Sequence, residues 1–397
     1  MKKALVVFLI LAVAGGLFAT PTFSGSVETG IGIGFDNTEG DNANKALVGW
    51  IMNRGEHGLL ADLNVSGSGG GKDADGNPNP YGSWGASMGV RGRADNRLNT
   101  GAGYTIMING GTVWWQPNDY VYLAIGTGGN KDYGTPGGLG QKNGVHDADG
   151  LKIALTPISG LSIGVNAFYN NAKKNLEDMN IGFGVNYTMP SLLNVVANIR
   201  YKPEETATKP KDNAFDAAAG ANFLGLSAVG LTKLAADVST YNWGAKFQSI
   251  GVGEAITFKA LENLLTLDLS GQQYFYMGDE NYDFIPMRYR AGVSYTIDKI
   301  VPAIQFQYTM GNSPAFNYRN STEVGGVVVT PDANGKTSFK DGKDLVALGI
   351  SPQVTFNFGP TLTIGWNIQM DMSKDAKATA TTPTMQHLIY GTVKINF

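Results

Sequence analysis

Apolar residues alternate with small or polar residues along most of the chain. Between residues 23 and 35 the odd positions, from Phe23 to Phe35, are mostly apolar, whereas the even positions are Ser, Glu or Gly. The same alternation recurs at residues 59–66, 84–93, 161–167, 179–187, 287–295 and 362–371. A period of two places alternate side chains on opposite faces of a β-strand. Each segment has about 9 to 12 residues, the length of a tilted strand that crosses a bilayer. The pattern predicts an all-β protein.

The predicted strands are joined by connections of two kinds. The short connections are residues 115–120, 156–160, 297–302 and 357–360. The long, polar connections are residues 68–83, 128–149, 202–212, 311–343 and 373–384. Short turns at one end and long loops at the other are typical of transmembrane barrels of the outer membrane. We therefore expect an antiparallel up-and-down barrel, with the apolar face toward lipid and the small-polar face toward a wet interior.

The ends of the predicted strands are rich in aromatic residues, as in the interfacial girdle of such barrels. Trp114, Trp115 and Tyr120 flank one short turn, and the last alternating strand ends the chain at Phe397. In this terminal strand and in its overall pattern the chain resembles bacterial outer-membrane porins, and residues 113–119 are similar to a turn in the porin-like barrels of spirochaetes. The resemblance implies that Phe397 is part of the signal for the barrel-assembly machinery.

The number of strands follows from the chain length. One strand together with its share of loop takes roughly 20 residues. Once the predicted leader is subtracted from the 397 residues, the remaining length predicts about 18 strands, with 16 and 20 left open. Fifteen strands can be assigned from one that ends at Trp115 to the C-terminus, and four candidates precede them, at residues 23–35, 45–53, 57–67 and 84–94. A first strand that enters from the periplasm requires an odd number before residue 105. Either one candidate is wrong or another strand lies within residues 96–104.

The first 19 residues have the pattern of a secretory signal peptide. Lys2 and Lys3 precede an apolar stretch at residues 4–14, and small residues follow. This stretch is too short for a transmembrane helix. We expect cleavage after Ala19, with Gly16 as the alternative site, and a single barrel domain over residues 20–397. The expected location is the outer membrane.

Composition excludes several kinds of chemistry. Charged residues make up only 16% of the chain, and the formal net charge is -3, which argues against a nucleic-acid partner. Without cysteine, thiol chemistry, disulfides and zinc knuckles are excluded. The three histidines are scattered, and no serine is suitably placed beside His387 for hydrolysis. We expect no metal, no cofactor and no enzymatic activity.

A barrel of 16 to 18 strands encloses an aqueous channel unless it is plugged, and no plug precedes the first predicted strand. The parity of the pattern places on the interior face the basic residues Arg91, Arg93, Lys152, Arg200, Lys202, Arg288, Arg290 and Lys394 and the acidic residues Glu28, Asp62, Asp268 and Asp371. Charges that line a pore bias the ions that pass. The loop at residues 128–149, with Asp132, Asp147 and Asp149, is the candidate for an acidic constriction that faces the arginines; alternatively it covers the outer mouth.

Two functions are compatible with this sequence. The first is a porin for passive diffusion of small hydrophilic solutes and ions, surrounded by membrane lipids and able to form a homo-oligomer such as a trimer. The alternative is a surface adhesin or structural barrel whose long loops, especially residues 311–343, bind a partner. The small-polar interior face favours the channel.

Overall fold

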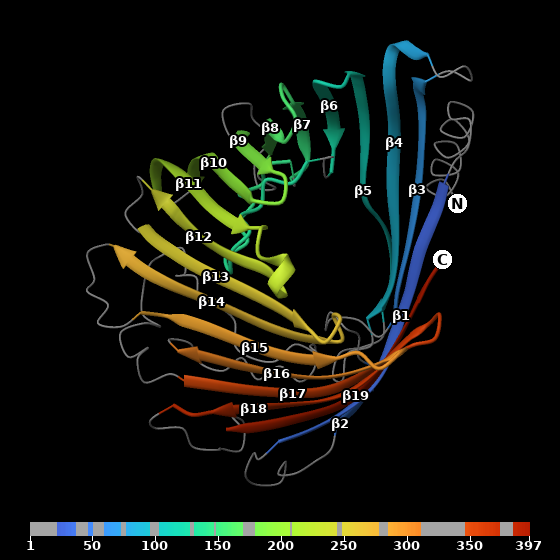
Figure 1. The fold of residues 1–397 in the computed structure, drawn as a ribbon, viewed down its shortest axis with the longest axis vertical. Helices are drawn as coiled ribbons and strands as arrows, with labels where there is room; N and C mark the ends of the chain where they lie inside the picture. Colours follow the sequence, from blue (N-terminus) through green and yellow to red (C-terminus); the bar gives the residue numbers. More distant parts are fainter. Residues whose placement is uncertain are drawn as a thin grey trace.

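The computed structural model describes residues 22–36, 47–50, 59–72, 77–95, 103–127, 131–146, 148–169, 179–206, 209–243, 248–277, 285–310, 346–373 and 384–397. They form a closed antiparallel β-barrel (Figure 1). The predicted leader at residues 1–19, Asp147 and the long loop at residues 311–343 lie outside the described residues. In the described part of the chain, no helix is long and apolar enough to cross a membrane.

In the described part of the chain, the secondary structure is almost entirely strand, with one short 3-10 helix, η2 (Ser227–Val229). The first nine segments are β1 (Thr22–Asp36), β2 (Leu47–Trp50), β3 (Leu59–Lys72), β4 (Pro78–Asp95), β5 (Gly103–Asn118), β6 (Val121–Gly126), β7 (Gly150–Leu155), β8 (Leu161–Tyr169) and β9 (Met179–Met189). The others are β10 (Leu193–Thr206), β11 (Lys209–Phe223), β12 (Leu231–Trp243), β13 (Gln248–Ala260), β14 (Leu265–Met277), β15 (Met287–Tyr295), β16 (Ile300–Met310), β17 (Val346–Asn357), β18 (Thr361–Asp371) and β19 (Met385–Asn396).

The barrel closes between its first and last strands. β1 pairs with β19, and at the end of this seam Gly25 and Phe397 exchange backbone hydrogen bonds of 2.8 and 3.0 Å. The opposite edge of β1 pairs with β3 at residues 22–29 and with β2 at residues 31–34. β2 and β3 are thus two parts of one interrupted strand.

The barrel therefore has 18 strands, as predicted. The two candidate strands at residues 45–53 and 57–67 belong to the same interrupted strand, so three strands precede β5. This odd number is what the periplasmic entry of the first strand requires. All later strands pair antiparallel with their sequence neighbours.

The two faces of the wall differ as the alternation predicts. On β18, Ile364 and Trp366 are 49% and 40% exposed, whereas Asn367 and Gln369 are 2% and 9% exposed. The apolar side chains stand on the outer surface, where only lipid can accommodate a continuous apolar belt. The polar side chains face inward, where neighbouring wall residues and the chain inside the barrel cover them.

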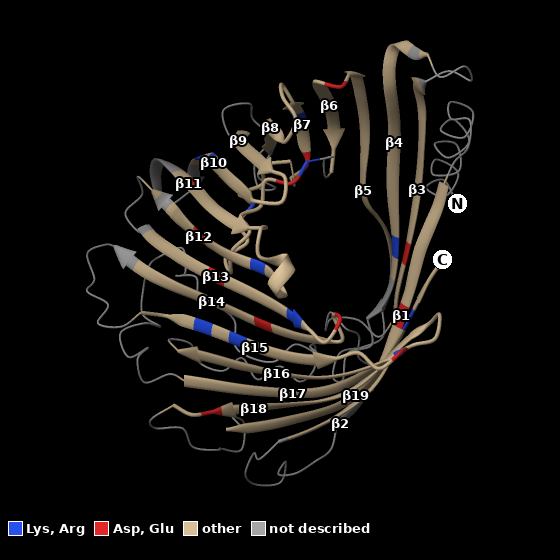
Figure 2. Ribbon diagram, in the orientation of Figure 1, with Lys and Arg blue, Asp and Glu red and all other residues tan. Residues whose placement is uncertain are grey.

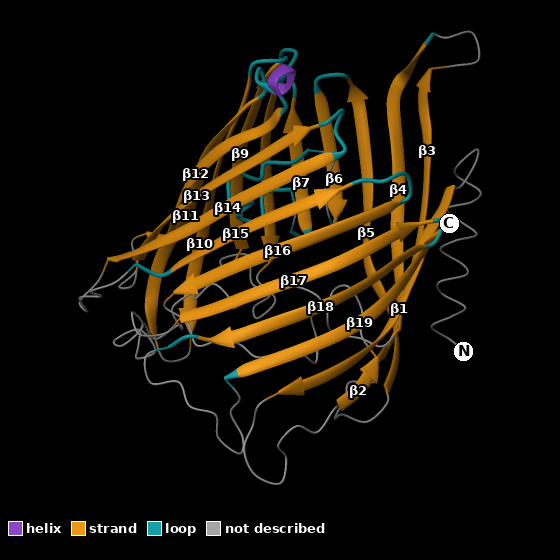
Figure 3. Cartoon of the chain, turned by 60° about the horizontal axis from the view of Figure 1, so that its bottom comes forward, coloured by secondary structure: helices purple, strands orange, loops and turns teal. Residues whose placement is uncertain are grey.

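Two of the predicted long loops are wrong. Residues 68–83 form most of a β-hairpin, because β3 continues to Lys72 and β4 begins at Pro78. The Trp84 ring lies over Gly69, where a methyl group would be 3.0 Å from it, so an aromatic side chain covers this glycine-rich strand. Figure 3 shows this hairpin at the same end of the barrel as η2. Residues 202–212 likewise lie mostly in β10 and β11, which are separated only by residues 207–208.

Candidate pore constriction

The described part of the connection between β6 and β7 lies inside the barrel. Its described residues, 131–146 and 148–149, are called here the inner loop. Figure 1 shows these residues on the inner side of the strands, and they contact residues of β8, β12 and β14. The described residues of the loop predicted at residues 128–149 thus lie against the inner wall.

Tyr133 is the most deeply buried anchor of the inner loop. Its side chain is 0% exposed, and its hydroxyl forms a 2.7 Å hydrogen bond with the Ser162 hydroxyl of β8. The ring lies over Gly164 and Gly184, where added methyl groups would be 2.5 and 2.7 Å from it. Burial raises the pKa of the Tyr133 phenol to about 12. The phenol is therefore neutral at physiological pH and can donate to Ser162.

A single wall carboxylate, Asp237 of β12, holds the middle of the inner loop. It accepts hydrogen bonds from the Thr135 hydroxyl at 2.6 Å, the Leu139 N–H at 3.2 Å and the Gly140 N–H at 3.0 Å. Asp237 is only 5% exposed, so little water competes for these bonds. Hydrogen bonds to a charged acceptor are stronger than neutral ones. This carboxylate fixes residues 135–140 against the wall.

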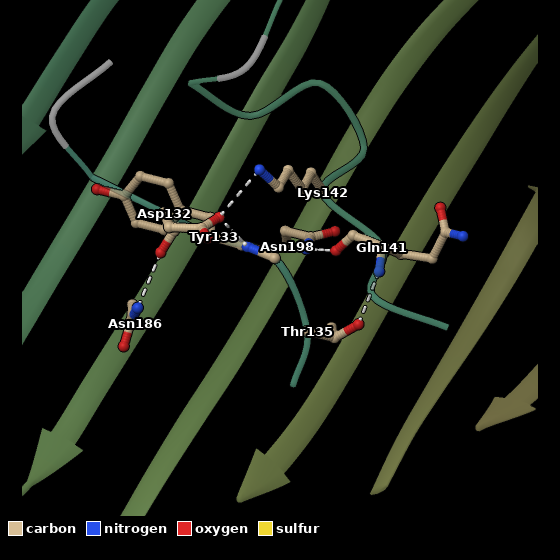
Figure 4. A network of polar contacts seen from close by, with 8 residues as sticks. Asp132, Tyr133, Thr135, Gln141, Lys142, Asn186 and Asn198 are labelled. Atoms are coloured by element: carbon tan, nitrogen blue, oxygen red, sulfur yellow. Dashed lines mark hydrogen bonds and ion pairs between the residues drawn. The ribbon is translucent and has the colours of Figure 1, made fainter. Parts of the chain in front are cut away.

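Amide side chains of the wall bind carbonyls of the inner loop before and after the segment that Asp237 holds (Figure 4). The Asn198 side chain of β10 donates to the carbonyls of Tyr133 at 2.7 Å and Gln141 at 2.8 Å. On β9, the Asn186 amide donates to the Asp132 carbonyl at 2.8 Å. These bonds satisfy backbone groups that a buried loop would otherwise leave without partners.

The C-terminal part of the inner loop packs around His146. The His146 ring lies edge-on to Tyr133, with centroids 5.1 Å apart, and its Nε2 is 3.0 Å from the Ile153 carbonyl oxygen. Burial lowers the pKa of His146, and the nearby Lys152 ammonium lowers it further. Lys152 itself is 0% exposed and donates to the Gly126 carbonyl. Lys152 therefore lies beneath the root of the loop and does not line open space.

The acidic residues predicted for this loop have different environments. The Asp132 side chain is 71% exposed, and its carboxylate is 3.7 Å from the Lys142 ammonium. Asp149 is also exposed, next to the start of β7. Asp132 and Asp149 are thus accessible from the interior or its mouth.

Several predicted interior charges form ion pairs within the wall. Arg91 of β4 binds both oxygens of Asp62 of β3, at 2.7 and 2.9 Å. Arg200 and Lys202 both contact the Asp216 carboxylate, the latter at 2.8 Å. The Arg91–Asp62 pair is neutral, and Asp216 compensates one of the two positive charges of Arg200 and Lys202, which weakens the field of these residues on a passing ion. The Arg93 side chain lies outside the described part of the structure.

The two arginines of β15 donate hydrogen bonds to neutral amides. Arg288 donates to Gln272 at 2.9 Å, and Arg290 donates to Gln307 at 2.6 Å. Figure 2 shows basic residues on β15 and on β4, in separate parts of the wall. Asp268 on the neighbouring strand is exposed and accepts a 2.6 Å bond from the Thr257 hydroxyl.

Arg290 also borders a polar niche of about 440 Å³ in the wall of β12 to β17. Lys233, Asp268, Gln305 and Gln353 contribute to its lining. Of the remaining predicted charges, Glu28 is buried opposite Lys394 across the barrel seam, and Asp371 accepts a 2.9 Å bond from the Ser373 N–H. The structure does not gather the predicted charges into one ring.

The anchoring residues were not among the sequence-predicted site residues. Asp237 and Asn198 have the parity of interior residues, but nothing near them in the sequence indicates the loop. Six interior glycines leave room for the loop: Gly164, Gly182, Gly184, Gly220, Gly251 and Gly253. Gly182 and Gly184, and likewise Gly251 and Gly253, are two residues apart on the interior face, and this spacing was the available signal. A small-residue lining of the lumen explained the spacing equally well.

No protein-family model and no curated protein sequence matches this chain. Among solved structures, OccK7 (OpdD) of Pseudomonas aeruginosa aligns over 96% of this chain and 99% of its own, with 9% identity and a TM-score of 0.54. OpdL of Pseudomonas aeruginosa aligns over 96% of this chain and 98% of its own, with 8% identity and a TM-score of 0.52. At such low identity the similarity establishes the fold alone. The chain has the barrel fold of these bacterial outer-membrane porins.

Proposed function

We propose that the protein is an outer-membrane channel for passive diffusion of small hydrophilic solutes and ions, and that the inner loop forms its constriction. The observation that carries the proposal is a loop fixed by Asp237 and Asn198 against the inside of an 18-strand barrel. Barrels of this size have room for an aqueous channel. A loop attached along one side of the wall narrows such a channel and leaves a path beside it.

Arg288 and Arg290 are the proposed selectivity residues of the channel. They project from β15 into the interior, and neutral glutamines, Gln272 and Gln307, hold their guanidinium groups. In a narrow aqueous space, fixed charges of this kind attract permeant anions and repel cations. The exposed carboxylates Asp132 and Asp149 would oppose this field from the loop. We expect a channel with modest anion preference.

The signal peptide, the outer-membrane location and assembly through Phe397 belong to the same proposal. Phe397 lies at the seam, where its ring contacts Gly25 on the outer surface, 2.6 Å from the position of an added methyl group. The terminal strand is thus the strand that closes the barrel. A signal at this end would be read before closure, while the strand edge is still accessible. We propose no metal, cofactor or catalytic role.

Planar-bilayer recording of the purified protein tests the proposed function. Stepwise conductance increments on the nanosiemens scale are expected, with a reversal potential that indicates anion preference in a salt gradient. Heat-modifiable migration in gel electrophoresis establishes that the sample is folded. A folded protein that inserts into the bilayer and remains silent would contradict the channel.

A further inference from the structure

Among the described residues, one charged side chain on the outer surface of the barrel, that of Glu254, has surroundings that are mostly apolar. Glu254 lies on β13 between Gly253 and Ala255, which face the interior and are buried. Its cross-strand neighbours are Ala236 of β12 and Gly271 of β14. An added methyl group at Gly271 would touch the Glu254 carboxylate, so this carboxylate lies flat over Gly271 on the outer surface.

The position of Glu254 is in the middle of the apolar belt. It is the central residue of β13 (Gln248–Ala260), and the next outward residues on the strand are Val252 and Ile256. Val238 and Leu269, on the flanking strands, are 45% and 51% exposed. Among the described residues, no side chain donates a hydrogen bond to the Glu254 carboxylate. A carboxylate that faces hydrocarbon at this depth is unfavourable, and residues of this kind are usually functional.

The wall around Glu254 has unusually little side-chain bulk. The cross-strand row that contains it runs from Ala221 through Ala236 and Glu254 to Gly271. Beside this row, a groove of about 380 Å³ is lined mainly by apolar side chains, among them Ile256, Leu269 and Phe306. A second barrel could therefore approach this surface closely. Small residues allow the same close approach between transmembrane helices.

Hydrogen-bond donors lie next to the carboxylate on the same surface. Tyr289 of β15 is the cross-strand neighbour of Gly271, and its hydroxyl accepts from the Gln273 amide. Its own O–H proton is therefore directed away from that amide. An acceptor and a donor two strands apart form a self-complementary patch. Two copies related by a two-fold axis along the membrane normal would each offer the donor to the other's acceptor.

We propose that this surface, defined by Ala221, Ala236, Glu254, Gly271 and Tyr289 and called the Glu254 face, binds a second copy of this chain. Lipid tails offer no hydrogen bond to a carboxylate at this depth, whereas the same patch on a second barrel offers the Tyr289 hydroxyl. The inference rests on the proposed membrane location of the barrel. It adds a dimer interface on the side of β11 to β15, away from the β1–β19 seam.

The test measures the oligomeric state of full-length protein in lipid nanodiscs and by chemical cross-linking in native outer membranes. The wild type is expected to be a dimer or a larger assembly that contains this pair. Ala236→Trp places an indole beside Glu254 and should reduce the cross-linked fraction about tenfold, which corresponds to roughly 1.4 kcal/mol. The matched control is Ala61→Trp on β3, half-way round the barrel, where the outward alanine is opposite Val27. This control should leave the cross-linked fraction unchanged.

Two substitutions of the carboxylate separate its role from steric effects. Glu254→Leu should abolish association and leave a folded monomer, since the outer surface becomes entirely compatible with lipid. Glu254→Gln keeps an acceptor for Tyr289 and should retain most of the dimer. A monomeric wild type, or equal dimer fractions in Ala236→Trp, Ala61→Trp and Glu254→Leu, would overturn the proposal. Bilayer conductance of the same variants keeps the two proposals apart, because a conducting monomeric wild type contradicts only the interface.

Discussion

Replacing Asp237 by Asn should loosen the middle of the inner loop. The carboxylate accepts three hydrogen bonds from Thr135, Leu139 and Gly140. An asparagine whose oxygen takes the Oδ2 position still accepts from Thr135 and Gly140 and turns its NH₂ group toward the Leu139 N–H. The bond from Leu139 is then lost at roughly 1.5 to 3 kcal/mol, and the two remaining bonds weaken because their acceptor is no longer charged. Residues 135–140 would then leave the wall and enter the lumen transiently.

Single-channel recording measures this effect as the frequency of brief closures. We expect Asp237→Asn to close many times more often than the wild type and to keep the fully open conductance, since Tyr133 and Asn198 still hold the ends of the loop. The matched control is Asp268→Asn, which also removes a wall carboxylate but one whose bond, from Thr257, does not involve the inner loop. If Asp237→Asn and Asp268→Asn show the closure frequency of the wild type while both are folded, the anchoring role is refuted.

Three further predictions test the charges and the orientation of the wall. Replacing Arg288 and Arg290 together by Ser should shift the reversal potential in a salt gradient toward cation selectivity, and the shift should shrink as the Debye length falls from about 10 Å at 0.1 M to about 3 Å at 1 M salt. Ile364→Arg, on the outer surface, should destabilise the barrel by about 2 to 4 kcal/mol if the site is near the midplane, as measured by urea unfolding in detergent or lipid. The control Thr363→Arg, on the interior face, should be tolerated. Equal effects of the two substitutions would contradict the assignment of faces. Brief closures should become more frequent as the pH falls below about 6.5. Burial lowers the pKa of His146, so protonation of this side chain favours the detached loop. The same pH dependence in His146→Gln would disprove this cause.

The sequence predicted the wall well because lipid and water impose opposite chemistry on alternate residues. On β18, Ile364 and Asn367 could be assigned to their faces from parity alone. The interrupted second strand could not be recognised, since residues 45–53 and 57–67 are two separate apolar segments in the sequence. Only their common pairing with β1 unites them. The β3–β4 hairpin was mistaken for a loop because glycine-rich composition usually marks turns, and the covering Trp84 ring is a tertiary contact.

The constriction was less predictable because long-range contacts form it. Asp237 is 102 residues from Thr135 and 97 from Gly140, and no local pattern connects them. From parity alone, every charged residue on the interior face was predicted to line the pore. Lys152 is in fact buried beneath the loop, and Arg200 is paired with Asp216. Parity shows which way a side chain points and does not show what lies in front of it.

Cysteine accessibility during current recording tests the channel most directly, because the chain contains no native cysteine. Arg290→Cys places a thiol on the interior face, and Ala291→Cys places one on the outer face of the same strand. A charged, membrane-impermeant thiol reagent should reduce the current of open Arg290→Cys channels in discrete steps and leave Ala291→Cys channels unchanged. Channels of Arg290→Cys that keep their full current after its thiol has been modified would contradict a conduction path through the barrel.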